Sequence, residues 1–214
     1  MQKPYTSYNL YFFIPVLFWV LLGGIALLNY DSRTLFSLVN MHYTATTDLL
    51  MYYITMLGEG VISGIVLLLL LFKRTFRNWW YFAAAVLSNA LPPFIIQTVK
   101  HSVQAPRPLN YFKEADWIHT LPEWPRLMNN SFPSGHTCAA FCFFTLVAIL
   151  LRSGYKWVGF LFFALAILVA YSRLYLAAHF FIDVYVGSIL GVIFTVLIIF
   201  LLNKYQGYFF KQKD

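Results

Sequence analysis

Two histidines in the second half of the chain are placed where they could act in turn on a phosphate group. His179 precedes Asp183 by four residues, so on a helix both side chains lie on one face and the carboxylate can hydrogen-bond one ring nitrogen. That bond fixes the tautomer and leaves the other nitrogen as a nucleophile. His136 is then free to donate a proton to a leaving oxygen. The spacing therefore predicts two histidines in different roles.

Three cations and a helix start complete the set of groups that phosphoryl chemistry needs. Lys100, Arg107 and Arg173 supply positive charge, and a guanidinium group binds phosphate oxygens in a bidentate manner. The segment Pro133-Ser134-Gly135-His136 reads as the beginning of a helix, whose free backbone N–H groups attract an anion. Gly135 would let the backbone approach that anion closely.

Taken in order, these residues form a three-part signature. It runs Lys100-x6-Arg107-Pro108, then Pro133-Ser134-Gly135-His136, then Ser172-Arg173-x5-His179-x3-Asp183. The signature resembles that of the type 2 phosphatidic acid phosphatase superfamily of membrane lipid phosphatases, with no departure at any signature position. The resemblance covers roughly residues 53 to 202.

The resemblance implies a role for each signature residue. By similarity, His179 attacks phosphorus to form a phosphohistidine, Asp183 orients it, and His136 protonates the departing group. The residues implied to hold the phosphoryl oxygens are Lys100, Arg107, Ser134, Gly135 and Arg173. The family needs no metal, so we expect no metal and no other cofactor.

The composition requires a membrane around these residues. Of the 214 residues 60% are apolar and only 11% are charged, against about 25% charged in soluble domains. This balance excludes a soluble domain and nucleic-acid binding. Hydropathy predicts an all-α polytopic membrane protein with six transmembrane helices. The expected spans are Tyr11 to Leu28, Tyr53 to Phe72, Trp79 to Val99, Thr137 to Leu151, Trp157 to Tyr171 and Phe181 to Leu202.

The distribution of Lys and Arg predicts the orientation. With the N-terminus inside, the cytoplasmic loops and ends carry nine basic residues and one acid, whereas the outer side carries six basic residues and six acids. Because cytoplasmic loops are enriched in Lys and Arg, both termini are expected in the cytoplasm and the site in the periplasm or exterior. The short chain favours a bacterial inner membrane.

One long loop stands out on the outer side. The polar segment from Lys100 to Ser134 has 35 residues and five prolines, and loops of this length are usually functional or lids. The Asn29 to Thr47 connection is the other sizeable loop on that side. No internal repeat is visible, so residues 1–214 are interpreted as one domain.

Other chemistries fit the same residues less well. A zinc site built from His136, His179 and Asp183 would be opposed by the neighbouring cations. A serine hydrolase triad from Ser134, His136 and Asp183 is disfavoured because the first two are near neighbours at a helix start. Soluble haloperoxidases share the signature, but the six spans argue against them. Snorkelling cations around a buried His–Asp pair remain the structural alternative.

The expected partners are a phosphorylated membrane lipid as substrate and the lipid bilayer, and no obligate protein partner is evident. Undecaprenyl pyrophosphate, phosphatidylglycerol phosphate, phosphatidic acid and lipid A all present the same group to such a site. A transporter or flippase for anionic lipids would use the cations for binding only, and it would not need His179 paired with Asp183. Glu59 is an acid within a span, so it is either functional or paired with a site cation.

Overall fold

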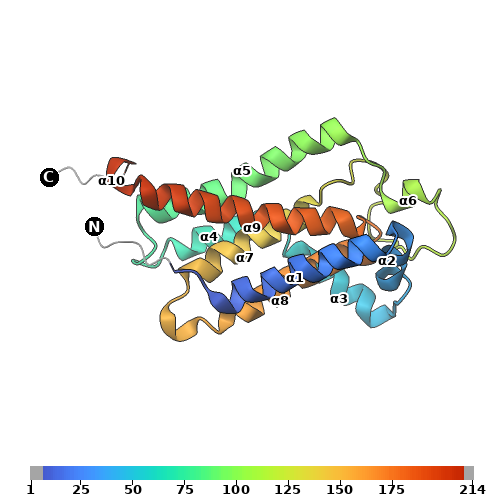
Figure 1. The fold of residues 1–214 in the computed structure, drawn as a ribbon, viewed down its shortest axis with the longest axis horizontal. Helices are drawn as coiled ribbons and strands as arrows, with labels where there is room; N and C mark the ends of the chain where they lie inside the picture. The colour runs from blue at the N-terminus through green and yellow to red at the C-terminus, as the bar shows by residue number, and fades with distance from the viewer. Residues whose placement is uncertain (1–6, 210–214) are drawn as a thin grey trace.

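The computed structural model describes residues 7–209, and within that range the chain forms helices and loops with no strand. The short helices α2, α6 and η1 lie in the connections between the longer helices, and the short helix α10 follows α9 (Figure 1). In chain order the elements are α1 (Leu10–Asn29), α2 (Ser32–Asn40), α3 (Ala45–Met56), α4 (Gly60–Leu70), α5 (Trp79–Val103), α6 (Pro108–Tyr111), α7 (Gly135–Leu150), η1 (Ser153–Tyr155), α8 (Val158–Tyr175), α9 (Phe181–Lys204) and α10 (Gln206–Phe209).

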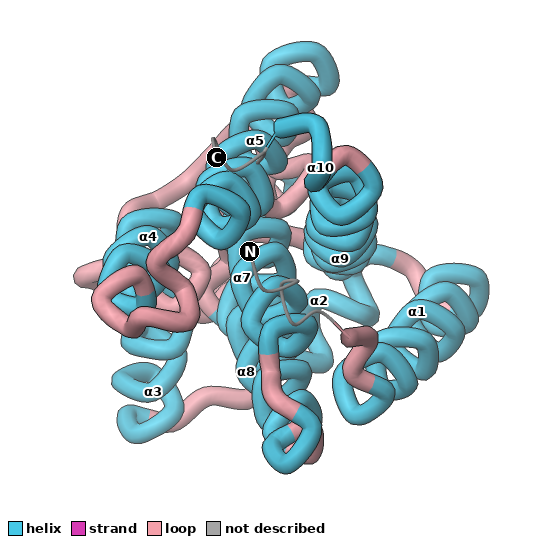
Figure 2. Tube along the Cα trace, turned by 90° about the vertical axis from the view of Figure 1, so that its left-hand side faces the viewer, coloured by secondary structure: helices cyan, strands magenta, loops and turns pink. Residues whose placement is uncertain are grey.

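The long helices run side by side, and the connections at the two ends differ in size. Figure 1 shows α2, α6 and the long loop after α5 at one end of the bundle, with α10 at the other. Viewed along the bundle, α7 lies in the middle (Figure 2), where it packs against α9, α8, α5 and α4. The helix that begins at Gly135 is therefore the central element of the fold.

The structure agrees with an all-α membrane protein but does not fix the number of spans. Four helices are long and apolar enough to cross a membrane, namely α1, α5, α8 and α9. The pair α3 and α4 passes the same test only as one span bent by 58°, and α7 is a shorter apolar helix of 16 residues. The count of six therefore stays a prediction.

The second expected span differs from what the sequence indicated. A continuous helix from Tyr53 to Phe72 was expected, but α3 ends at Met56 and α4 starts at Gly60. Gly58 lies at the break, and a Cβ atom there would come within 2.7 Å of Val169 Cγ1 and 2.9 Å of the His136 carbonyl oxygen. The chain bends here because only a glycine can pass so close to α7 and α8.

Glycines also bring α9 close to α7. A Cβ atom at Gly187 would lie 2.6 Å from the Ser134 carbonyl oxygen, and one at Gly191 would lie 2.6 Å from that of Cys138. These two glycines are one helical turn apart, so the backbones touch along a stripe, as small residues allow in membrane helix pairs. Cys138 and Cys142 are buried free thiols in this contact, which agrees with a packing role.

The end of the bundle that carries α2 and α6 has a small hydrophobic core of its own. Phe36 of α2 packs with Leu109, Ile118, Ala177 and Phe180. The Asn29 to Thr47 connection is thus partly the helix α2 rather than a plain loop. Lys3, Lys211, Lys213 and Asp214, which entered the charge count, lie outside the described residues.

Candidate active site

A cavity of about 540 Å³ opens at the end of the bundle that carries the long loop, between α4, α5, α7, α8 and that loop. Eight signature residues were given a catalytic or phosphate-binding role above, and six of them line this cavity. These are Lys100, Arg107, Gly135, His136, Arg173 and His179. The other two, Ser134 and Asp183, lie behind this wall.

His179 is placed by a tight turn between α8 and α9. The Arg173 carbonyl oxygen accepts the backbone N–H groups of Ala178 and His179, and Ala177 adopts a left-handed conformation with φ of 50°. This conformation is costly for a residue with a Cβ atom, so the surrounding packing must hold it. The imidazole is 1% exposed. Burial, followed by the positive charges of Arg107, Arg173 and Lys100, holds the pKa of His179 well below its ordinary value, which keeps the ring neutral.

Asp183 lies behind His179, as the spacing predicted, but a third residue stands between the two. Asp183 Oδ2 is 3.4 Å from His179 Nδ1, and it accepts hydrogen bonds from Ser131 Oγ and from the Phe180 backbone N–H at 2.9 Å. Ser131 Oγ also lies 3.5 Å from His179 Nδ1. The histidine Nδ1 therefore faces this polar group, and its Nε2 remains for the cavity.

Backbone carbonyls hold the Arg107 guanidinium in place. Its Nε donates to the Asn129 carbonyl oxygen at 2.7 Å, its Nη1 to that of Ala178 at 3.0 Å, and its Nη2 to that of Asn130 at 3.4 Å. The first and third of these carbonyls belong to the long loop, and the second is the residue before His179. Arg107 thus ties the loop to the turn that carries the histidine.

Arg173 is almost fully buried, and one N–H group of its guanidinium is unpaired in the part of the chain that the structure describes. Its Nη1 donates to Thr55 Oγ1 at 2.6 Å, and its guanidinium carbon lies 5.1 Å from the ring centre of Trp124. Its Nε has no hydrogen-bond partner among the described residues. A buried unpaired N–H group on a cation is costly unless a ligand accepts it. Arg173 also lines the cavity, so the positive charge of its guanidinium favours an anion there.

The net charge of the site leads to the same conclusion. Lys100, Arg107 and Arg173 are each at most 9% exposed, whereas Asp183 is the one acid among the buried polar residues that the structure describes. Burying three cations with one buried carboxylate, and with Glu59 as a second acid in the cavity wall, still leaves an excess of positive charge whose cost a bound anion would offset.

The start of α7 adds neutral donors to these cations. The first-turn N–H groups of Gly135 and His136 have no partner within the helix, because no carbonyl precedes them there. A Cβ atom at Gly135 would meet nothing closer than Ile96 Cγ2 at 3.8 Å. The glycine is therefore not needed for packing, and its open face adjoins the cavity. Helix start and cations together form an anion-binding surface.

In this structure the Ser134 side chain caps a helix and does not line the cavity. Its hydroxyl caps α7, accepting the Thr137 backbone N–H at 3.4 Å and lying 2.9 Å from Thr137 Oγ1. Its own backbone N–H donates to the Asp183 carbonyl oxygen at 3.0 Å. Ser134 joins α7 to α9, and its role in phosphate binding stays a prediction.

The sequence did not single out several residues that shape the site. Ser131, Thr55 and the carbonyls around Arg107 come from segments without a recognisable motif. Trp124, in the long loop, covers Arg173. Gly58 gave a faint signal as a glycine between apolar runs, but its contact with His136 depends on the fold.

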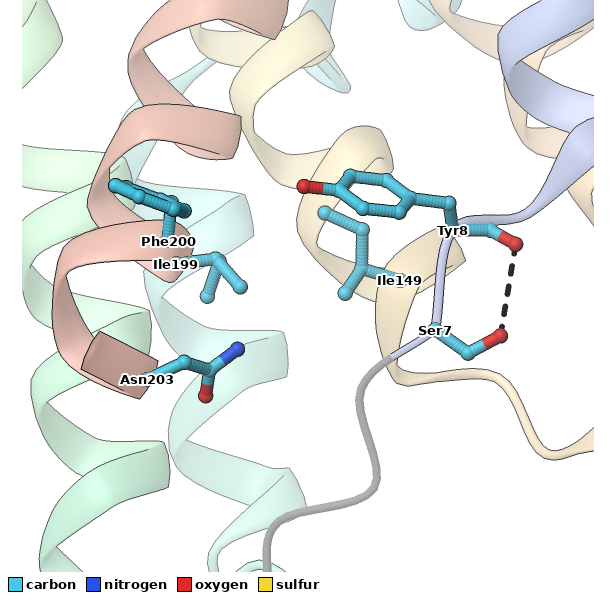
Figure 3. A pocket seen from close by; sticks show the side chains of 6 residues that line it. All are labelled: Ser7, Tyr8, Ile149, Ile199, Phe200 and Asn203. Carbon is cyan, nitrogen blue, oxygen red and sulfur yellow. Dashed lines mark hydrogen bonds between the residues drawn. The ribbon is translucent and has the colours of Figure 1, made fainter.

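Two other cavities help to define the site by contrast. One of about 100 Å³ lies at the opposite end of the bundle, where Tyr8, Ile149 and Asn203 line it without any ionisable acid, Lys, Arg or His (Figure 3). The second, of about 270 Å³, is an apolar groove between α4 and α5 that shares Gly60 with the site cavity. The polar cavity thus continues into an apolar one that runs along two membrane helices.

Comparison with known proteins agrees with this geometry. The sequence model of the PAP2 superfamily matches residues 79–206, a range that includes the whole three-part signature. The chain belongs to the PAP2 superfamily. The undecaprenyl-diphosphatase of Sulfolobus acidocaldarius (strain ATCC 33909) is 31% identical over 193 residues, covering 89% of this chain and 88% of the relative.

Solved structures of this superfamily have the same fold. The crystal structure of Aquifex aeolicus LpxE matches with a TM-score of 0.66 and 26% identity, over 79% of this chain and 96% of that one. A transmembrane PAP2 type phosphatidylglycerolphosphate phosphatase from Bacillus subtilis matches with a TM-score of 0.62 and 22% identity over the whole of both chains. The multi-pass membrane fold expected from the resemblance is confirmed.

Proposed function

We propose that this membrane lipid phosphatase works through a phosphohistidine at His179. The observation that carries the proposal is the cationic cavity, which Lys100, Arg107 and Arg173 line together with the two histidines. Because His179 Nδ1 faces Asp183, its Nε2 is the nitrogen left for the substrate. A phosphoryl group bound by the cations would lie beside a neutral imidazole, which is the form that attacks phosphorus.

The two histidines would divide the reaction between them. His179 Nε2 forms a bond to phosphorus as the bond to the leaving oxygen breaks, and His136 gives that oxygen a proton. Water then attacks the phosphohistidine, with His136 accepting its proton, and inorganic phosphate is released. Asp183 orients His179 through Nδ1, while Lys100, Arg107, Arg173 and the start of α7 stabilise the charge on the phosphoryl oxygens.

We further propose that no metal takes part. Three buried cations already supply the positive charge that a divalent ion would provide. Among the residues that the structure describes, no group of three or more His, Cys, Asp or Glu could hold a metal ion. Phosphate release in EDTA should equal that of the untreated protein. Inactivation by EDTA that zinc or magnesium reverses would overturn this part of the proposal.

The substrate we propose is a phosphate monoester or pyrophosphate of a membrane lipid, with its chain in the groove between α4 and α5. Gly60 and Gly64 leave this groove open, since a Cβ atom at either would meet nothing within 4 Å. The relative named undecaprenyl-diphosphatase supports a lipid pyrophosphate. The four lipids named above form the natural test panel.

The orientation we propose places the site in the periplasm or exterior and both termini in the cytoplasm of a bacterial inner membrane. It rests on the excess of Lys and Arg in the loops at the other end. Single cysteines at Trp117 and Arg74, with Cys138 and Cys142 replaced, should label oppositely with an impermeant maleimide in whole cells. Labelling at position 74 alone would show that the protein has the opposite orientation.

The mechanism is tested by trapping the intermediate. Purified protein mixed with a ³²P-labelled lipid phosphate and quenched in alkali should retain label, because a phosphohistidine is stable to base and labile to acid. His179→Ala should retain none and release no phosphate, while remaining folded in detergent. Turnover of this variant within about tenfold of the wild type would rule out His179 as nucleophile.

A further inference from the structure

Glu59 is an acid that the phosphate-binding machinery does not need. It lies at the break between α3 and α4 and lines the same cavity as His136, Arg173 and His179. Its side chain makes no hydrogen bond to cap α4 and no ion pair within the described residues, although it interacts electrostatically with Arg173. A carboxylate that is exposed in a cavity for anions repels them unless some group of the ligand binds it.

The position of Glu59 identifies which part of the substrate would meet it. In phosphoryl transfer the attacking and leaving atoms lie roughly in line on opposite sides of phosphorus. His179 attacks from one side, so the leaving oxygen faces His136. Gly58 packs directly on His136, with a would-be Cβ atom 3.1 Å from His136 Cβ. Glu59 follows Gly58 in the chain and lines the cavity with both His136 and Arg173, so it lies where a leaving group beside His136 can reach it.

We infer that Glu59 is a specificity-determining residue that accepts a hydrogen bond from a hydroxyl or amine on the leaving group. The inference rests on the proposed function and deepens it. A leaving alcohol with a neighbouring donor satisfies the carboxylate. A leaving phosphate, as in a lipid pyrophosphate, brings a second negative charge toward it. Glu59 therefore favours phosphate monoesters of hydroxyl-bearing headgroups over pyrophosphates.

The test compares three short-chain substrates that differ at the leaving group. Dioctanoyl phosphatidylglycerol phosphate loses a glycerol that carries a free hydroxyl, dioctanoyl phosphatidic acid loses an alcohol without a donor, and farnesyl pyrophosphate loses a charged phosphate ester. Phosphate release gives kcat/KM for each with the wild type and with Glu59→Gln. Glu123→Gln is the matched control, because it removes an exposed acid of the same face that does not line the cavity.

We expect Glu59→Gln to lower the ratio of the first substrate to the second by about tenfold, because the amide oxygen still accepts the hydrogen bond but without the charge that strengthens it. The ratio of the pyrophosphate to the second substrate should rise by about fivefold, since a repulsive charge is gone. Glu123→Gln should leave both ratios within about twofold of the wild type.

Two outcomes would overturn the inference while leaving the proposed function intact. If Glu59→Gln slows all three substrates equally, Glu59 acts on the common chemistry or on folding, because neither effect changes a ratio. If all ratios stay unchanged, Glu59 does not contact the leaving group. A wild type that releases phosphate from none of the lipids would instead refute the proposed function itself.

Discussion

Ser131→Ala is the most direct test of how the nucleophile is held. The change removes the hydroxyl that donates to Asp183 Oδ2 and lies 3.5 Å from His179 Nδ1. Asp183 then keeps the Phe180 backbone N–H as a donor, with His179 Nδ1 at the longer distance of 3.4 Å. A buried hydrogen bond to a charged group contributes about 1.5–3 kcal/mol. Because the carboxylate orients the nucleophile, we expect kcat to fall by about ten- to a hundredfold.

The assay is phosphate release by detergent-purified protein at saturating lipid phosphate, together with thermal unfolding of the same samples. Ser188→Ala is the control, because this buried serine of α9 also bonds on both sides, donating to the Tyr185 carbonyl oxygen at 2.7 Å and accepting from Trp19 Nε1 at 2.8 Å. It should lower stability without lowering kcat. A kcat of Ser131→Ala within about twofold of the wild-type value would refute the reasoning.

Three further predictions follow from the site. His136→Ala should slow an alkyl phosphate by about a hundredfold or more but an activated aryl phosphate far less, because the latter leaves without a proton; equal losses would argue against His136 as the acid. Gly58→Ala should reduce kcat by about tenfold or more by displacing His136, whereas Gly154→Ala in η1, where a Cβ atom meets nothing within 4 Å, should not; steady-state rates that agree for the two variants would contradict this. Because the pKa of His179 is lowered on folding, the unfolded chain binds more protons below about pH 6.5, so wild-type stability falls with pH by up to about 1.4 kcal/mol per unit. Thermal unfolding from pH 7 to 5 should show a shallower loss in His179→Asn.

The parts of the fold that the sequence predicts are those that depend on local patterns. Long apolar runs indicated α1, α5, α8 and α9 within a few residues of their bounds. The i, i+4 spacing placed Asp183 behind His179, and the shared location of the polar residues at helix ends predicted that they meet.

The parts that the sequence does not predict depend on contacts between distant segments. Thr55 bonds to Arg173 across 118 residues, and Ser131 reaches Asp183 across 52. Neither has a periodicity or motif that marks it. The break at Gly58 interrupts a hydropathy profile that is otherwise continuous, because its cause is the backbone of α7 passing nearby. Hydropathy indicates whether a segment lies in lipid or in water. It does not indicate which neighbouring backbone the segment packs against.

The shortness of α7 links the reaction to the thickness of the membrane. Its 16 residues span about 24 Å, while a typical hydrocarbon core measures about 30 Å. If the far end of α7 lies at the opposite boundary, the end that carries His136 lies below the plane of the ester groups, and a lipid phosphate has to move inward to reach it. Longer acyl chains in the host membrane would lengthen that movement, and shorter ones would reduce it. We therefore expect turnover to depend on hydrophobic mismatch, a property of the surrounding lipids rather than of the protein.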